Sequence, residues 1–232
     1  MTDSIPIPSK KKTVSLILKL AVVLAAAAGV TLSALSSSEA FMGGRVVFMY
    51  FTIQSNIAIA SVSLIGVFLL IRGKPAGGAW YVIKYVATVS ITLTGAVFTF
   101  VLAPTLGDFA WKLQNVLTHV VVPLAAIVDF FVTGPYADFK KSSVFFVTLP
   151  PLAYAVYAGI GYVAGWEFSK GKNYPYFFLN WGSPAGAFGF TKELPFMGCG
   201  WWMLALLILL IAVGYVYLAI VGALKRAMTK RK

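Results

Sequence analysis

The chain has 232 residues, of which 59% are apolar and 11% are charged, and its formal net charge is +12. Repeated apolar runs of about 20 residues, the length that crosses roughly 30 Å of hydrocarbon, exclude a soluble globular protein. We expect no nucleic-acid partner, because the Lys and Arg residues lie at the ends of the apolar runs, as membrane topology signals do.

We predict an all-α fold, a helical bundle that forms a single transmembrane domain over residues 14–224. The first apolar run is long and lacks a convincing cleavage site, so it is predicted to be a retained helix and not a signal peptide. Basic tails are expected at residues 1–13 and 225–232. The six predicted transmembrane helices cover residues 14–35, 47–71, 80–103, 112–133, 144–165 and 200–224.

The distribution of basic residues predicts how the bundle is oriented. Six spans put both termini on one side, and 14 of the 19 Lys and Arg residues fall on that side, against five on the other. Basic residues gather on the cytoplasmic side of membrane proteins, so both termini are predicted to be cytoplasmic. We expect an integral, multi-pass protein of the cytoplasmic membrane that has membrane lipids as partners.

Two residue counts limit the chemistry. Cys199 is the single cysteine and His119 the single histidine. A disulfide within the chain, a thiolate metal cluster, bis-histidine haem ligation and a His-based zinc site are therefore excluded. The stretch "RGKPAGG" lacks the spacing of a phosphate-binding loop. We expect neither a metal nor an organic cofactor, and no use of ATP.

Polar side chains gather near the outer end of the second span, in the stretch "YFTIQSN". At a rise of about 1.5 Å per residue, Thr52 lies about 8 Å below the outer end of its span, and His119 about 10 Å below that of the fourth. Their similar depth makes a contact possible. A hydroxyl beside a neutral imidazole pairs a nucleophile with a general base, so Thr52 and His119 are the candidate catalytic residues.

Side-chain amides lie close to both residues along the chain. Asn56 is one turn below Thr52, Asn115 is one turn above His119, and Gln54 belongs to the same polar stretch. Such amides donate hydrogen bonds to a developing oxyanion, and together they predict a polar pocket that opens toward the outer leaflet. Hydrogen bonding between helices is the alternative role for each amide.

No acidic residue lies beside this pair in the sequence. Glu39 and Asp108 are in outer loops, and either would have to fold inward to orient the imidazole. A purely structural reading also remains open, because a hydroxyl in a membrane helix usually bonds to the carbonyl one turn back and a lone histidine often bonds across helices.

Lys84 and Asp129 are ionisable residues within predicted spans. Each lies four residues from the cytoplasmic end of its span, the third and the fourth respectively. Their depths agree, which predicts an ion pair. We favour a structural role for this pair in fixing helix register, because it is far from the histidine and near one interface.

The outer segment over residues 166–199 contains "NYPYFFLNWGSPAGAFGF", which is dense in aromatic residues, Gly and Pro. This composition is incompatible with a regular helix and favours the headgroup region. The segment is expected to lie over the mouth of the bundle. A lid that admits a lipid and an interfacial anchor are both open as its role.

Three stretches, "YFTIQSN", "LTHVVVPLAAIVDFF" and "YPYFFLNW", together resemble a family of bacterial six-span integral membrane proteins, which is distantly similar to the animal androgen-induced-gene family of membrane threonine hydrolases. The resemblance implies a six-helix membrane fold and the cleavage, inside the bilayer, of esters of fatty acids with hydroxy fatty acids. It also implies that Thr52 is the nucleophile and His119 its partner.

The function expected from the sequence is an intramembrane hydrolase of lipid esters that uses Thr52 and His119. One alternative is a small-molecule or proton-coupled transporter in which His119, Asp129 and Lys84 form a relay. Another is a non-catalytic scaffold that binds a partner or anionic lipids through the tail "KRAMTKRK".

Overall fold

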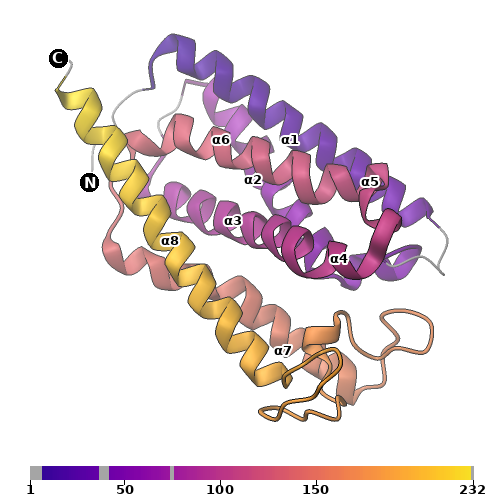
Figure 1. Ribbon diagram of the computed structural model, residues 1–232. Coiled ribbons are helices and arrows are strands. Elements are labelled where there is room, and N and C mark those ends of the chain that lie inside the picture. Colours follow the sequence, from indigo (N-terminus) through magenta and orange to yellow (C-terminus); the bar gives the residue numbers. More distant parts are fainter. Residues whose placement is uncertain (1–6, 37–41, 74–75, 231–232) are drawn as a thin grey trace.

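The computed structural model describes residues 7–36, 42–73 and 76–230 and is all-α in this part of the chain (Figure 1). Six helical stretches are long and apolar enough to cross a membrane, which confirms the predicted fold class and an integral, multi-pass protein. They are Ser9–Leu35, Phe51–Ile71, Gly78–Trp111, Leu113–Tyr136, Lys141–Val163 and Cys199–Thr229.

Three of the six stretches are single helices: α1 (Ser9–Leu35), α2 (Phe51–Ile71) and α8 (Cys199–Thr229). The others are joined from shorter pieces. The third combines α3 (Gly78–Val97) with α4 (Ala103–Leu106), the fourth combines α5 (Leu113–Val116) with α6 (Val122–Thr133), and the fifth adds a 3-10 segment before α7 (Leu149–Val163).

Two helices extend beyond the predicted transmembrane domain 14–224. α1 begins at Ser9 and not at residue 14, so the end of the predicted basic tail 1–13 is helical, while residues 1–6 lie outside the described part. α8 continues to Thr229, into the predicted tail 225–232. Long basic side chains keep their charged ends in water, which lets an apolar helix extend past the hydrocarbon.

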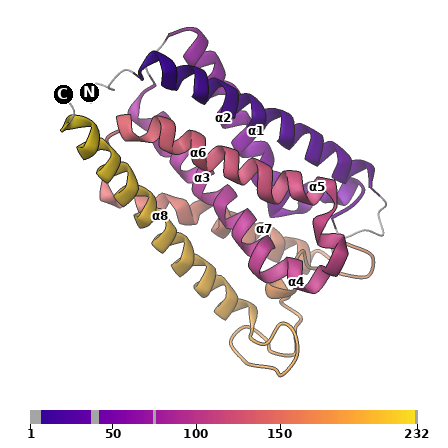
Figure 2. The same ribbon diagram turned by 45° about the horizontal axis from the view of Figure 1, so that its top comes forward.

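The helices form two groups. α1, α2, α3 and the α5–α6 segment pack together, whereas α7 and α8 lie on the other side of α3 (Figures 1 and 2). The start of α1 and the end of α8 are at the same end of the bundle. This agrees with six crossings; the assignment of that end to the cytoplasm stays a prediction from charge.

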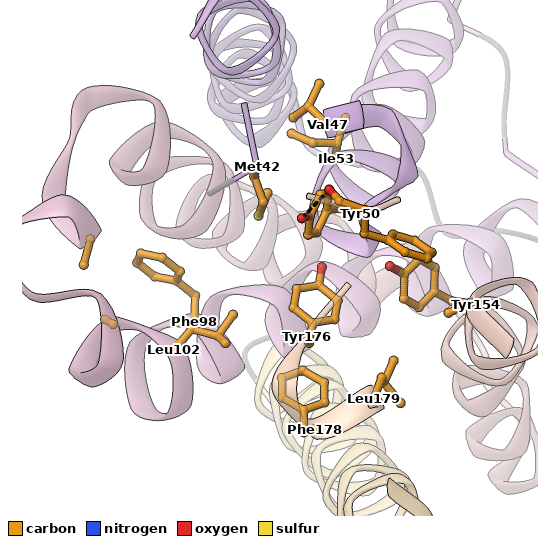
Figure 3. Close-up of a cluster of buried hydrophobic side chains, with 14 residues drawn as sticks. Met42, Val47, Tyr50, Ile53, Phe98, Leu102, Tyr154, Tyr176, Phe178 and Leu179 are labelled. Carbon is orange, nitrogen blue, oxygen red and sulfur yellow. Dashed lines mark hydrogen bonds between the residues drawn. The ribbon is translucent and has the colours of Figure 1, made fainter. Parts of the chain in front are cut away.

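The core at the opposite end contains part of the long segment between α7 and α8. Its Tyr176, Phe178 and Leu179 are each at most 6% exposed. Tyr50, Tyr154 and Tyr176 approach one another there from three different segments (Figure 3). The segment is therefore packed into the end of the bundle as part of its core.

At Gly95, α3 packs closely against the α5–α6 segment. A Cβ atom added at this position would lie 2.8 Å from the carbonyl oxygen of His119. Backbone atoms move less readily than the end of a flexible side chain, so even one extra methyl group would force the two helices apart.

We predict that Gly95→Ala lowers the stability of the protein by about 1–3 kcal/mol, because overpacking outweighs the better helix propensity of alanine. Thermal unfolding in detergent measures this. Gly159→Ala in α7 is the matched control, since its Cβ would meet the ring of Trp181 at an ordinary 3.6 Å. An equal melting temperature for both variants would contradict the prediction.

Candidate functional site

Thr52 and His119 are in contact in the structure. Thr52 lies in the first turn of α2 and is 4% exposed, and His119 lies in the turn between α5 and α6 and is 2% exposed. The Oγ1 atom of Thr52 is 3.3 Å from Nε2 of His119. The structure thus brings together the two residues that the sequence could match only by their depth.

Hydrogen bonds at the second ring nitrogen fix the tautomer of His119. Nδ1 is 3.0 Å from the carbonyl oxygen of Asn115 and 3.0 Å from Oγ1 of Thr118. The Thr118 hydroxyl donates its hydrogen to the carbonyl oxygen of Gln114. Both neighbours of Nδ1 therefore offer lone pairs, so Nδ1 carries the proton and Nε2 presents its lone pair to Thr52.

The imidazole is also held by its face. The ring of Phe98 stacks on it with a centroid separation of 3.8 Å and an interplanar angle of 20°. Phe98 begins a π-helical turn (Phe98–Leu102), and His119 is in the middle of another (Leu117–Val121). Such widened turns change the direction of side chains and occur often at functional sites, and here they bring the two rings together.

Tyr176 is a third member of this site that the sequence analysis did not assign. The Thr52 backbone N–H donates to the Tyr176 hydroxyl at 3.3 Å, and that hydroxyl is 3.4 Å from Thr52 Oγ1. Burial raises the pKa of Tyr176 to about 12, so the phenol stays protonated and can donate. Only its inclusion in the quoted stretch "YPYFFLNW" signalled it.

The three candidate amides donate to backbone carbonyls and not to the Thr52 hydroxyl. Both hydrogens of the Asn56 amide go to carbonyl oxygens, those of Thr52 and Thr118, at 2.8 and 3.1 Å. The Gln54 amide donates to the Phe48 carbonyl. The Asn115 side chain donates to the Phe109 carbonyl, and this residue reaches His119 through its own backbone oxygen.

The acidic candidates do not complete the site either. Asp108 is exposed in the turn Gly107–Trp111. Glu39 lies outside the described residues. The group that orients the imidazole is the Asn115 carbonyl, a neutral acceptor. A carbonyl fixes the tautomer as a carboxylate does, but it stabilises an imidazolium less.

An apolar cavity of about 70 Å³ lies against Thr52. Its wall also includes Tyr176, Thr94 and side chains of α7 and α8 such as Tyr154 and Leu206, and His119 does not line it. The polar pocket expected here is therefore corrected: the polar groups pack against one another, and the open space beside Thr52 is apolar. We call this space the Thr52 cavity.

Lys84 and Asp129 form the expected ion pair, with Lys84 Nζ 2.6 Å from Asp129 Oδ2. A second lysine, Lys19 of α1, binds the same carboxylate at 2.7 Å, and both lysines are at most 4% exposed. Ser15 and Thr133 supply further hydrogen bonds. Lys19 is one of the 14 basic residues that predict the orientation of the bundle, but its side chain lies in the interior and packs against Gly66.

Comparison with family models, with curated proteins and with solved structures finds no match for this chain. The family resemblance seen in the three sequence stretches therefore stays a prediction.

We predict that Asp129→Asn is much more damaging than Lys19→Met. The first variant leaves two buried ammonium groups without a counter-charge, a loss of about 3–5 kcal/mol. The second keeps the ion pair between Lys84 and Asp129, in which one positive and one negative charge balance. Melting temperatures in detergent compare them. The reverse order would show that the cluster does not depend on its single carboxylate.

Proposed function

We propose that this protein is an intramembrane hydrolase of lipid esters in which Thr52 is the nucleophile and His119 the general base. The observation that carries the proposal is the 3.3 Å contact between Thr52 Oγ1 and His119 Nε2, together with the Asn115 carbonyl that leaves Nε2 unprotonated. An unprotonated imidazole nitrogen at a hydroxyl is the arrangement that activates an oxygen nucleophile.

The first half of the reaction transfers the acyl group to the protein. Thr52 Oγ1 bonds to the ester carbonyl carbon while its proton passes to Nε2 of His119. The resulting tetrahedral oxyanion collapses, and the bond between the carbonyl carbon and the alcohol oxygen breaks. The Nε2 proton goes to that oxygen, which releases an alcohol and leaves an acyl ester on Thr52.

The second half restores the nucleophile. His119 Nε2 takes a proton from a water molecule as its oxygen attacks the acyl carbon. Collapse of this second tetrahedral species returns the proton to Thr52 Oγ1 and releases a carboxylic acid. Both halves use the same nitrogen, first as base and then as acid.

Tyr176 is suited to stabilise the oxyanion. Its hydroxyl is 3.4 Å from Thr52 Oγ1, and Tyr176 lines the Thr52 cavity, whereas His119 contacts the same oxygen without lining that cavity. An acyl group bound in the cavity would meet a neutral phenol that can donate a hydrogen bond. A preorganised donor of this kind in a water-poor site is worth about 100-fold or more in rate.

The stretch of α6 between His119 and Asp129 counts against the relay that the transporter alternative requires. On α6, the buried residues Val122 and Ala126 lie between His119 and Asp129 and belong to an apolar cluster with Val22 of α1. Ten residues of helix also separate the two ionisable side chains by about 15 Å. Along α6 itself no polar side chain lies between His119 and Asp129, which favours the hydrolase.

We predict that Thr52→Ala and His119→Ala each lower kcat/KM for a fluorogenic medium-chain ester by about 100-fold or more, since both remove the activated nucleophile. Thr52→Ser should keep measurable turnover. Tyr176→Phe should lower kcat by about 100-fold or more through the loss of a single donor.

Thr92→Val in α3 is the matched control for these variants. It also removes a hydroxyl from a helix, but Thr92 bonds to Tyr217 of α8 and does not line the Thr52 cavity. Wild-type turnover in folded Thr52→Ala would overturn the assignment of the nucleophile.

A further inference from the structure

A groove of about 450 Å³ runs between α2, α3 and α7. We call it the lateral groove; its wall is mainly apolar and includes Ala58, Ile83 and Ala153, which are all exposed. The α7 helix stands apart from α2 and α3 here (Figure 1). The volume falls within the range of about 300–1,000 Å³ that is typical of ligand sites.

The lateral groove is separated from the Thr52 cavity by two aromatic rings. Phe51 and Tyr154 line both spaces, and their rings meet edge to face with centroids 5.3 Å apart. Exposed side chains at the depth of this groove face the hydrocarbon of a bilayer, so lipid chains are the molecules in contact with it. The Thr52 cavity lies directly behind this aromatic pair.

A row of hydroxyl groups follows the same path along the seam of α2 and α3. Ser55 and Ser90 line the lateral groove, and Thr52 and Thr94 line the Thr52 cavity. The Ser55 and Thr94 hydroxyls are 2.8 Å apart, which links the two sides. Polar groups are thus present along the wall from the groove to the nucleophile.

Ser90 indicates what the groove binds. It is 3% exposed, lines the groove, and its Oγ atom has no hydrogen-bond partner among the described residues. A buried hydroxyl left unpaired costs about 1–3 kcal/mol, and this cost is offset when a ligand supplies an acceptor. An ester carbonyl on a hydrocarbon chain combines that acceptor with the apolar surface that the rest of the wall requires.

We propose that the lateral groove binds the acyl chain of an ester lipid arriving from the bilayer, that Ser90 donates to its ester carbonyl, and that the ester passes the Phe51–Tyr154 pair to reach Thr52. This inference rests on the proposed function for its last step only. Binding in the groove is independent of whether Thr52 is a nucleophile.

Binding is tested by photo-crosslinking in phosphatidylcholine nanodiscs that contain a diacylglycerol with a diazirine on one acyl chain. Peptide mass spectrometry should find adducts on the groove-lining parts of α2, α3 and α7. Ala58→Trp and Ala153→Trp fill the groove from exposed positions and should lower these adducts about tenfold. Leu64→Trp and Val156→Trp, which are exposed on the same helices but do not line the groove, are the controls.

Turnover tests the passage to Thr52. In the two groove-filling variants, the ratio of kcat/KM for a long-chain ester to that for a short soluble ester should fall at least about tenfold, and in the two controls it should not change. Ser90→Ala should raise KM for the long-chain ester about three- to tenfold with little change in kcat, as expected for one lost hydrogen bond in binding.

Adducts that are absent from the groove, or equal in filled and control variants, would overturn the groove as a binding site. The same holds if a free fatty acid with the same diazirine labels the groove and the diacylglycerol does not. If the groove is labelled but the wild-type protein hydrolyses neither ester, only the proposed function is contradicted. If Ala58→Trp and Ala153→Trp lose the adducts but keep the wild-type ratio of kcat/KM for the long-chain ester to that for the short ester, the passage to Thr52 is overturned.

Discussion

Hydrocarbon offers polar groups no water, so each polar side chain within the bundle needs a partner from the protein itself. This constraint is met, among the described residues, by two polar clusters in the interior. Near one end, a single carboxylate, Asp129, holds Lys19 and Lys84 and thereby connects α1, α3 and α6. Near the other, Asn56 of α2 bonds to the Thr118 carbonyl. Helix positions that satisfy these contacts also place Thr52 against His119.

The same constraint distinguishes polar groups that only stabilise the fold from those of the candidate site. Asn56 uses both of its amide hydrogens. The Thr52 hydroxyl has longer contacts, 3.3 Å to His119 Nε2 and 3.4 Å to the Tyr176 hydroxyl, and Thr52 borders open, apolar space. Groups that only stabilise a fold are enclosed on every side. A nucleophile must instead border a space that admits its substrate.

Depth along a helix could be predicted from the sequence, because topology and the rise per residue determine it. Thr52 with His119, and Lys84 with Asp129, were matched in this way. The direction of each side chain around its helix could not be predicted, so nothing in the sequence indicated that Lys19 binds Asp129. Tyr176 was missed for another reason: it lies in an irregular segment, where no periodicity relates sequence to position.

The central claim is that the Thr52 hydroxyl is activated by His119. The most direct measurement is labelling of the purified, folded protein with a fluorophosphonate, followed by peptide mass spectrometry to locate the adduct. The account predicts an adduct on Thr52 that is lost in His119→Ala. A folded protein that stays unlabelled, or an adduct on another residue that persists in Thr52→Ala, would contradict it.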